Sequence, residues 1–312
     1  MNNFKKTLAS LIFGFGYLFL SCDLAHGYHV AIVKSRTLNP YSEAIAGIRQ
    51  GIVESKEDIK ITEHDLKGDR EAGYEIAQEI LNQKINLVFA VGTDAAHGLN
   101  GRIGNIPLVV VMMHDPATEF EAKKKQTPTL YGIPLKVPIT TQMDLIKELT
   151  PQFKTISTDC DGVSKAEQVE MKNAALERNI NLVCISIDEK RGIASQLDVG
   201  KEKSDAFFFA LPSEPYHKAT IQEFLLFSAR NKFPIITFTP SHVRSGALMS
   251  FSYEFKETGM EAARLAVQIL GGTPISRKFR NVKNVIVTWN QTTGKSFNID
   301  TPKSKNVTIR YA

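Results

Sequence analysis

Short apolar segments alternate with amphipathic stretches along most of this chain. The first series predicts strands at residues 29–33, 60–65, 87–91 and 107–113, with helices at residues 41–55 and 70–83. Strands that are each separated by one helix form a parallel sheet with right-handed crossovers. The first part of the chain therefore predicts a doubly wound α/β lobe.

The same alternation begins again after residue 135. Predicted strands lie at residues 154–158, 181–187, 206–210 and 234–238, and predicted helices at residues 139–149, 165–178, 193–200 and 220–231. This second series predicts a second doubly wound lobe with a parallel sheet. The fold class is thus α/β, with two such lobes joined by hinge strands.

An apolar strand and a long helix return the chain to the first lobe near its C-terminus. The strand is predicted within residues 247–253 and the helix within residues 259–270, before the pair Gly271-Gly272. The lobes are therefore expected to comprise residues 28–135 plus 246–275 and residues 136–245 plus 276–312. Hinges are expected near residues 134–140, 238–245 and 272–283.

The N-terminus has the pattern of an export signal. Lys5 and Lys6 precede an apolar stretch at residues 8–20, which is shorter than the roughly 20 residues of a membrane span. Ser21 and Cys22 resemble the lipobox of bacterial lipoproteins, so residues 1–22 are predicted to be a signal segment with Cys22 lipidated. The alternatives are a secreted protein cleaved near residues 25–27 and an uncleaved anchor. A lipid chain would be the expected contact with a membrane.

Composition excludes several function classes. Hydrophobic residues make up 43% and charged residues 23% of the 312 residues, within the soluble globular range. The formal net charge is +5, but its only compact basic run is at residues 123–125, which suits a solvated loop. A nucleic-acid-binding protein would concentrate such charge on one face. No nucleic-acid partner is expected, and the protein is predicted to be a monomer.

The cysteines and histidines do not predict a metal site. The three cysteines include Cys160 and Cys184, each near the end of a predicted strand, and no Cys/His spacing suits zinc. Neighbouring parallel strands seldom give the geometry of a disulfide, so these two are expected to be buried free thiols, with pairing left open. We expect no metal and no cofactor.

Catalysis is the rival class of function. His114-Asp115 and Ser241-His242 place candidate bases beside candidate partners, but adjacent residues on an extended segment point in opposite directions. A nucleophile elbow, a phosphate-binding loop and a dinucleotide fingerprint are all missing from the sequence. We therefore expect no enzyme and no catalytic residues.

Ligands of doubly wound sheets bind beyond the carboxyl ends of the strands. Polar side chains are frequent at these positions, and two facing lobes would bring them to one cleft. The candidate ligand-binding residues are Ser35, Asn39, Thr93, Asp94, Asp115, Asp159, Ser213, Glu214, Ser241 and Phe251.

Three of the candidates have a plain structural alternative. Thr93 could either cap its helix or bind the ligand. Asp115 could either organise a turn or accept a hydrogen bond from a ligand ammonium group. Phe251 could either stack on an aromatic ligand or pack in the core. Arg36 and Arg244 could each meet a carboxylate or be solvated.

Several motifs together resemble one protein family. They are Gly47 and Gly51, residues 90–96, Ile106-Pro107 with Asp115-Pro116, Gln142, Leu145 and Ile146 with Pro151, and residues 246–248 through Gly259 and Ala262-Ala263 to Leu270. On these residues the mature chain is similar to the substrate-binding proteins of ABC transporters that include the tryptophan- and tyrosine-type binders, with the type I periplasmic-binding-protein fold.

The resemblance implies a function outside the cytoplasm. It implies capture of an aromatic or other small amino-acid-like solute and its delivery to an ABC permease and ATPase. A membrane receptor kinase or cyclase that senses the bound form is the alternative partner. Residues 158–164, 212–215 and 250–252 differ from the family's turns, which leaves the ligand class open.

Overall fold

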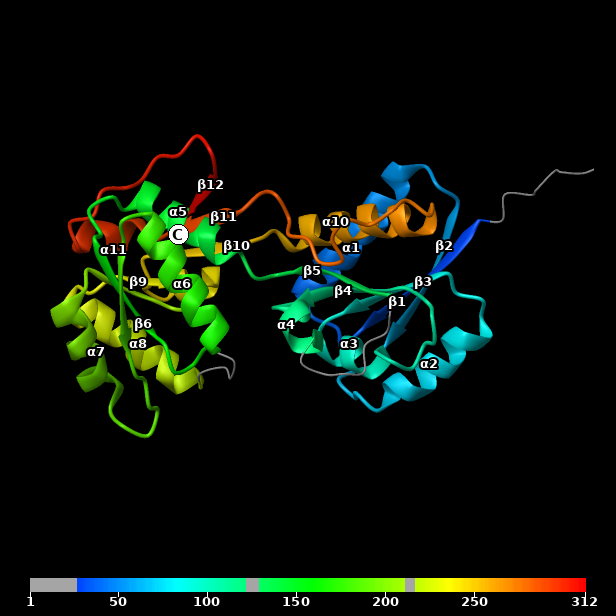
Figure 1. The fold of residues 1–312 in the computed structure, drawn as a ribbon, viewed down its shortest axis with the longest axis horizontal. Helices are drawn as coiled ribbons and strands as arrows, with labels where there is room; N and C mark the ends of the chain where they lie inside the picture. The colour runs from blue at the N-terminus through cyan, green and yellow to red at the C-terminus, as the bar shows by residue number, and fades with distance from the viewer. Residues whose placement is uncertain (1–26, 122–128, 211–216) are drawn as a thin grey trace, which may run out of the picture.

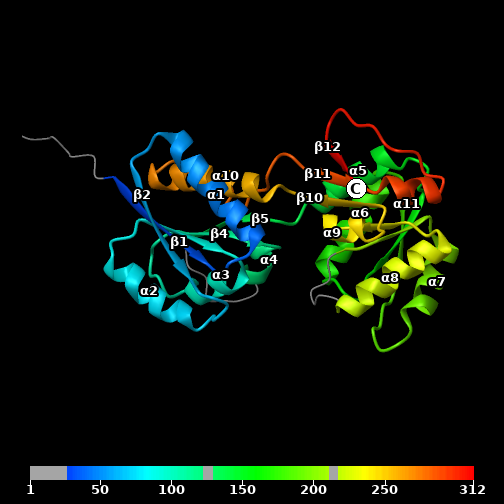
Figure 2. The ribbon, with the colours of Figure 1, turned by 180° about the vertical axis from the view of Figure 1, so that it is seen from behind.

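The computed structural model describes residues 27–121, 129–210 and 217–312. This part of the chain forms two lobes, each built on its own sheet (Figure 1). The view from behind shows the same separation, with the connecting segments running between the lobes (Figure 2). The expected α/β architecture of two lobes is confirmed.

The first lobe has a five-stranded sheet in the order β2-β1-β3-β4-β5, with every pair parallel. Its strands are β1 (Tyr28–Lys34), β2 (Ile59–Asp65), β3 (Leu87–Val91), β4 (Leu108–Met113) and β5 (Leu130–Pro134). Its helices are α1 (Asn39–Ser55), α2 (Ala72–Asn82), α3 (Thr93–Leu99), α4 (Pro116–Glu121) and α10 (Phe255–Leu270).

Helices cover both faces of this sheet, which explains its continuous apolar strands. In β1, Val30 and Ile32 join the buried cluster that includes α1 and α10, while Ala31 and Val33 join the cluster that includes α2 and α3. Strands β3 and β4 are buried at every position. Strands of parallel sheets that are covered on both sides read as apolar runs for this reason.

The second lobe has a seven-stranded sheet in the order β12-β11-β10-β9-β8-β6-β7. Its strands are β6 (Thr155–Asp159), β7 (Asn181–Ile185), β8 (Ala206–Phe208), β9 (Ile235–Thr237), β10 (Met249–Ser252), β11 (Ile286–Trp289) and β12 (Thr308–Tyr311). Its helices are α5 (Ile139–Leu149), α6 (Lys165–Glu177), α7 (Ile193–Lys203), α8 (Lys218–Asn231), α9 (Pro240–Arg244) and α11 (Gln291–Ser296).

One pair of strands in this sheet is antiparallel, in contrast to the all-parallel sheet expected. Strand β10 leads the chain out to α10 in the first lobe, and β11 brings it back, so the two run in opposite directions and pair antiparallel. Because β10 also pairs with β9, it belongs to the second sheet. Residues 246–252 therefore do not lie in the first lobe, where the sequence placed them.

The chain crosses between the lobes at three places. These are residues 135–138 between β5 and α5, residues 253–254 between β10 and α10, and residues 271–285 between α10 and β11. The last segment runs beside β5, where Gly132 and Phe279 form a parallel bridge. The hinge expected at residues 238–245 is wrong, because α9 occupies that segment and packs against the second sheet.

Helices α1 and α10 meet at glycine positions. A Cβ on Gly47 would clash with the carbonyl oxygen of Lys256, and one on Gly259 with the carbonyl oxygen of Ala44. At Gly51 an added Cβ would lie 2.6 Å from the Cβ of Ala263. The close backbone approach of these two helices, side by side in Figure 1, thus depends on the missing side chains.

We expect Gly47→Ala to destabilise the protein by about 2 kcal/mol, because the new methyl group overpacks the α1–α10 contact. The same change at an exposed helical glycine would stabilise by nearly 1 kcal/mol, so the sign is diagnostic. Urea unfolding measures the difference. The control is Val53→Ala on the exposed face of α1, which should change stability by less than about 0.5 kcal/mol. A stabilised Gly47→Ala protein would contradict the contact.

Candidate functional site

A cavity of about 230 Å³ lies where strand ends of both lobes converge. Residues that follow β4 and β5 reach it from the first lobe and the crossover at residues 135–138. Residues at or after the carboxyl ends of β8, β9 and β10 reach it from the second lobe, and the beginnings of α5 and α6 complete it. This is the location that doubly wound sheets favour for a ligand.

Aromatic side chains form much of the cavity wall. Four of them belong to the second lobe, one lies in the crossover after β10, and one begins α10. They are Phe208, Phe209, Phe238, Phe251, Tyr253 and Phe255. The rings of Phe209 and Phe238 lie edge to face, with centroids 6.3 Å apart. An aromatic wall of this kind suits a flat apolar ligand group, which it can contact by stacking or edge-to-face packing.

A three-membered ion-pair network closes another side of the cavity. The ammonium group of Lys136 lies 3.1 Å from Asp115 Oδ2 and 2.7 Å from Glu167 Oε1. Asp115 follows β4 in the first lobe, Lys136 lies in the crossover, and Glu167 is on α6 in the second lobe. The network therefore links the two lobes directly.

All three members of the network are held in their charged forms. Burial acts to raise the pKa of Asp115 and of Glu167, but hydrogen bonds and the charge of Lys136 lower both pKa values overall. Burial acts to lower the pKa of Lys136, and its hydrogen bond to Glu167 and the charge of Asp115 outweigh this and raise it. Half-buried groups paired in this way resist protonation changes around neutral pH.

A bulge at the end of β4 shapes the approach to this network. Met112 is buried with φ +60°, and the register with β5 shifts between Val111 and Met113. Val111 and Met112 consequently both join the cluster on the α1 and α10 face. The extra residue changes which side chains beyond the bulge point to each face, and His114 lines the cavity.

His114 is neutral at physiological pH. Burial first, and then the charge of Lys136, lower its pKa from 6.5 to about 4, although Asp115 and Glu167 act in the opposite direction. A neutral imidazole in the cavity can donate one hydrogen bond and accept another. It adds no positive charge to the site.

The start of α6 positions the acidic side chains of the second lobe. Ser164 Oγ accepts a hydrogen bond from the backbone N–H of Glu167, and the Glu167 carboxylate accepts one from the backbone N–H of Ser164. This capping box fixes Glu167. Glu170 and Met171 follow at helical spacing on the same face, and both line the cavity.

A disulfide fixes the loop that leads into α6. Cys160 and Cys184 are bonded, with their Cα atoms 5.3 Å apart, so the expected free thiols are wrong. Cys160 lies just beyond β6 and Cys184 on β7, whose strands pair in parallel, and this spacing falls within the range a disulfide requires. Cys184 is exposed rather than buried.

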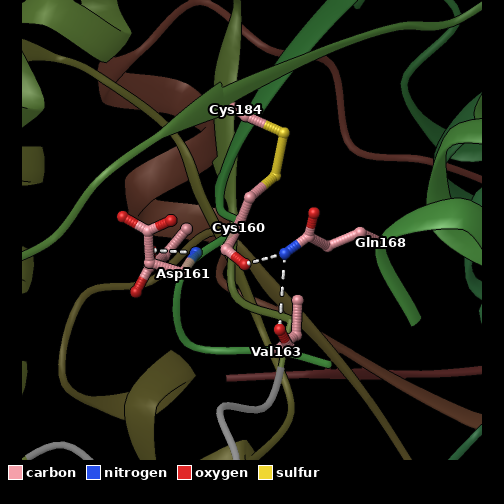
Figure 3. The surroundings of a disulfide bond; sticks show 6 residues. Cys160, Asp161, Val163, Gln168 and Cys184 are labelled. Atoms are coloured by element: carbon pink, nitrogen blue, oxygen red, sulfur yellow. Dashed lines mark hydrogen bonds between the residues drawn. A yellow bond between two sulfur atoms is a disulfide. The ribbon is translucent and has the colours of Figure 1, made fainter. Parts of the chain in front are cut away.

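Gln168 of α6 secures the same loop from the other side. Its Nε2 donates to the carbonyl oxygens of Cys160 and Val163, as Figure 3 shows. The Asp161 backbone N–H donates to Asp159 Oδ1. The disulfide and these hydrogen bonds together hold Val163, which lines the cavity.

The structure places four candidates of the first lobe outside the cavity. Ser35 is buried, and its Oγ accepts a hydrogen bond from the Ala95 backbone N–H at the start of α3. Asp94 forms an ion pair with Arg36, 2.9 Å apart. Asn39 is exposed and donates to Glu43, and Thr93 is exposed at the first residue of α3. Local contacts therefore account for Ser35, Asn39 and Asp94.

The remaining candidates are divided. Phe251 lines the cavity, and Asp115 contacts it through Lys136. Asp159 is buried and organises its own turn, and Ser241 lies on the far side of α9 in a groove against α8. Ser213, Glu214, Cys22 and the basic run at residues 123–125 lie outside the described residues. No ligand role among these is tested by the geometry alone.

Sequence reasoning missed most of the cavity. Lys136 and the phenylalanines after β8 and β9 were not singled out, although they occupy the strand-end positions used to find the others. The signal for Glu167 was present as the pattern Ser164 to Glu167, a capping box at the start of a predicted helix.

The chain matches the protein family described as ABC transporter substrate binding protein over residues 30–308. It belongs to that family. A tyrosine-binding protein of Clostridioides difficile (strain R20291) is 24% identical over 246 residues, covering 73% of this chain and 69% of the relative. The family and the fold are those of substrate-binding proteins, as expected from the sequence motifs.

Solved structures share the fold. A ligand-free, open substrate-binding protein with adhesive properties from Clostridium difficile has a TM-score of 0.74 at 19% identity, covering 91% of this chain and 99% of that one. A Streptococcus pneumonia ABC domain in complex with L-Trp has a TM-score of 0.61 at 20% identity, covering 92% and 100%. The XylFII–LytSN complex has a TM-score of 0.59 at 13% identity, covering 84% of this chain and 97% of that one.

Within residues 27–121, 129–210 and 217–312, no helix is both long and apolar enough to cross a membrane. In the same part of the chain, no three His, Cys, Asp or Glu side chains are grouped so that they could hold a metal ion.

We expect loss of the disulfide to destabilise the protein by about 3 kcal/mol, because it closes a loop with a sequence separation of 24 residues. The variant Cys160→Ala with Cys184→Ala should show this loss in urea unfolding. Dithiothreitol should lower the stability of the parent protein to a similar extent and leave the double variant unchanged. A parent protein indifferent to reductant would contradict the bond.

The free energy of unfolding should fall as the pH is lowered from 7 to 4.5, and protonation of His114 in the unfolded state accounts for part of this loss. Its pKa is about 4 in the folded protein and about 6.5 when unfolded, so the unfolded state binds the extra proton in this range. The contribution is full above pH 6.5 and is lost as the pH falls toward 4, by about 2 kcal/mol at pH 4.5. The His114→Gln variant should lose about 2 kcal/mol less of its free energy of unfolding over the same pH range, as measured by urea unfolding. An equal loss in both proteins would contradict the neutral, buried imidazole.

Proposed function

We propose that this protein captures a small amino-acid-like ligand with an aromatic side chain and delivers it to an ABC permease and its ATPase. The observation that carries the proposal is the aromatic-walled cavity bordered by Lys136 and Glu167. The tyrosine-binding relative and the neighbour solved with L-Trp support the same ligand class. Of the candidate residues named from the sequence, Asp115 and Phe251 are proposed for this site.

Hinge closure is the proposed mechanism. The three crossovers allow the lobes to rotate, and a ligand favours the closed form only if it interacts better with that form than with the open one. Lys136 is placed for this role because it already contacts both Asp115 and Glu167. Thr93, at the start of α3, is exposed and is proposed as a contact made on closure.

Location and lobe division are also proposals. We place the protein outside the cytoplasmic membrane, as the family suggests, with residues 1–22 as signal and Cys22 as the site of lipidation. The lobes are assigned as residues 28–134 plus 255–280 and residues 139–252 plus 285–312. A monomer suffices for this function, since one chain supplies the whole cavity.

The second candidate function is sensing. A receptor kinase or cyclase in the membrane would then read the closed form. The XylFII–LytSN complex supports this second candidate, because a protein of similar fold is solved there together with a partner. Transport of labelled ligand by cells with and without the protein separates the two functions.

We expect aromatic amino acids to stabilise the purified protein in a thermal-shift screen, and sugars and nucleosides to leave it unchanged. At one hundred times the dissociation constant, a ligand adds about 2.7 kcal/mol, or a shift of a few degrees. Phe238→Leu should weaken binding about tenfold because it removes one ring of the wall. The control is Tyr74→Leu, an exposed ring outside the cavity. A shift with sugars alone would contradict the proposal.

A further inference from the structure

The charges around the cavity do not balance. Lys136 is the one cation among the described residues that line it, and His114 is neutral. Against this single positive charge stand Asp115 and Glu167, both bonded to Lys136, and Glu170 on the next turn of α6. The charged residues that line the cavity are thus one cation and two carboxylates, an excess of one negative charge, and Asp115 behind Lys136 adds a second.

Two arginines among the described residues are already paired with other carboxylates. At the start of α10, Glu254 forms an ion pair with Arg310 of β12, which occupies that guanidinium. Burial raises the pKa of the Tyr253 hydroxyl above its usual value, so this group stays neutral and can donate a hydrogen bond. In the first lobe, Arg36 is paired with Asp94 and does not line the cavity.

Glu170 is the acceptor most available to a ligand. Among the described residues, none forms a hydrogen bond or ion pair with its carboxylate, and the side chain is exposed at the cavity. Glu167 is more committed, since its Oε1 contacts Lys136 and its Oε2 contacts Ser164. Each oxygen of a carboxylate can accept more than one hydrogen bond, so Glu167 can still take a second donor.

We propose that the cavity selects its aromatic ligand by a protonated amine, which Glu170 and Glu167 hold while the ring rests on the aromatic wall. This rests on the proposed function and narrows it to aromatic amines, of which amino acids are one kind. The ammonium group donates charge-assisted hydrogen bonds to the two carboxylates and relieves their excess charge. The ring gains contact with Phe238 and Tyr253.

A ligand carboxylate is dispensable for this recognition. Lys136, the one cation that could meet it, is already bridged by Asp115 and Glu167. A third carboxylate beside Lys136 would be repelled by those two, whereas an amine is attracted. The amine therefore contributes affinity, and the carboxylate contributes little.

Three compounds that share one ring test this directly by calorimetric titration at pH 7. They are tyrosine, tyramine, which lacks the carboxylate, and 3-(4-hydroxyphenyl)propionate, which lacks the amine. We expect tyramine to bind within about tenfold of tyrosine, and the acid to bind at least about 100-fold more weakly.

Two results would overturn the amine proposal while the aromatic binding function stands. One is equal affinity for tyrosine and the acid, and the other is binding of tyrosine without binding of tyramine. If none of the three compounds bound, the aromatic ligand class itself would fail, and the amine proposal with it.

Two variants assign the amine to its carboxylates. Glu170→Gln should weaken tyramine binding about tenfold, because a neutral amide replaces a charged acceptor. Glu167→Gln should weaken it as well, while Gln preserves the capping box. The matched control is Glu177→Gln at the far end of α6, outside the cavity, which should bind as the parent does. Parent affinity in both Glu170→Gln and Glu167→Gln would overturn the assignment, and thermal melts check that each variant is folded.

Discussion

Lys136 is the point at which the first lobe, the crossover and the second lobe meet. Its ammonium group contacts Asp115 beyond β4 and Glu167 on α6, and all three groups are partly buried. Breaking such a group by removing one partner leaves an uncompensated charge, which costs more than the pair itself contributes. The same three side chains consequently link the two lobes and place charge beside the cavity.

The threefold crossing of the chain makes each lobe depend on distant sequence. Helix α10 completes the first lobe only because Gly47, Gly51 and Gly259 allow its backbone to approach α1. The path out through β10 and back through β11 then requires an antiparallel pair in a sheet that is otherwise parallel. One buried cluster accordingly extends from Val30 in the first lobe to Trp289 in the second.

The fold could be predicted from the sequence because its evidence is periodic and local. Apolar runs such as residues 87–91 and amphipathic runs such as residues 139–149 report burial on two faces or on one. The sheet to which β10 belongs could not be predicted, because a buried strand next to a crossover has the same apolar sequence pattern in either lobe. The Cys160–Cys184 bond was missed because neighbouring parallel strands seldom give disulfide geometry, whereas here Cys160 lies just beyond β6 and the two Cα atoms are 5.3 Å apart.

The lining of the cavity was predicted less completely than the fold, for a different reason. Candidates were sought at strand ends, with polarity as the main filter. It selected Ser35 and Asp94, whose polar groups bond within the first lobe, and passed over Phe208 and Phe238. Lys136 lies in a crossover, where its two partners come from segments far apart in sequence.

The two lobes contribute unequally to the cavity, because several polar side chains at strand ends of the first lobe are bonded within that lobe. At the ends of β1 and β3 in the first lobe, hydrogen bonds serve the lobe itself: Ser35 holds the start of α3 and Arg36 holds Asp94. At the end of β4, the bulge at Met112 precedes His114 and Asp115, which reach toward the crossover instead. The second lobe supplies most of the aromatic wall and both acidic side chains of α6. The described lining of the cavity therefore comes mainly from the second lobe, while the first lobe contributes His114 and Phe255 and the crossover contributes Lys136. Lys136 thus joins side chains of the two lobes at the crossover itself, since Asp115 and Glu167 both contact it.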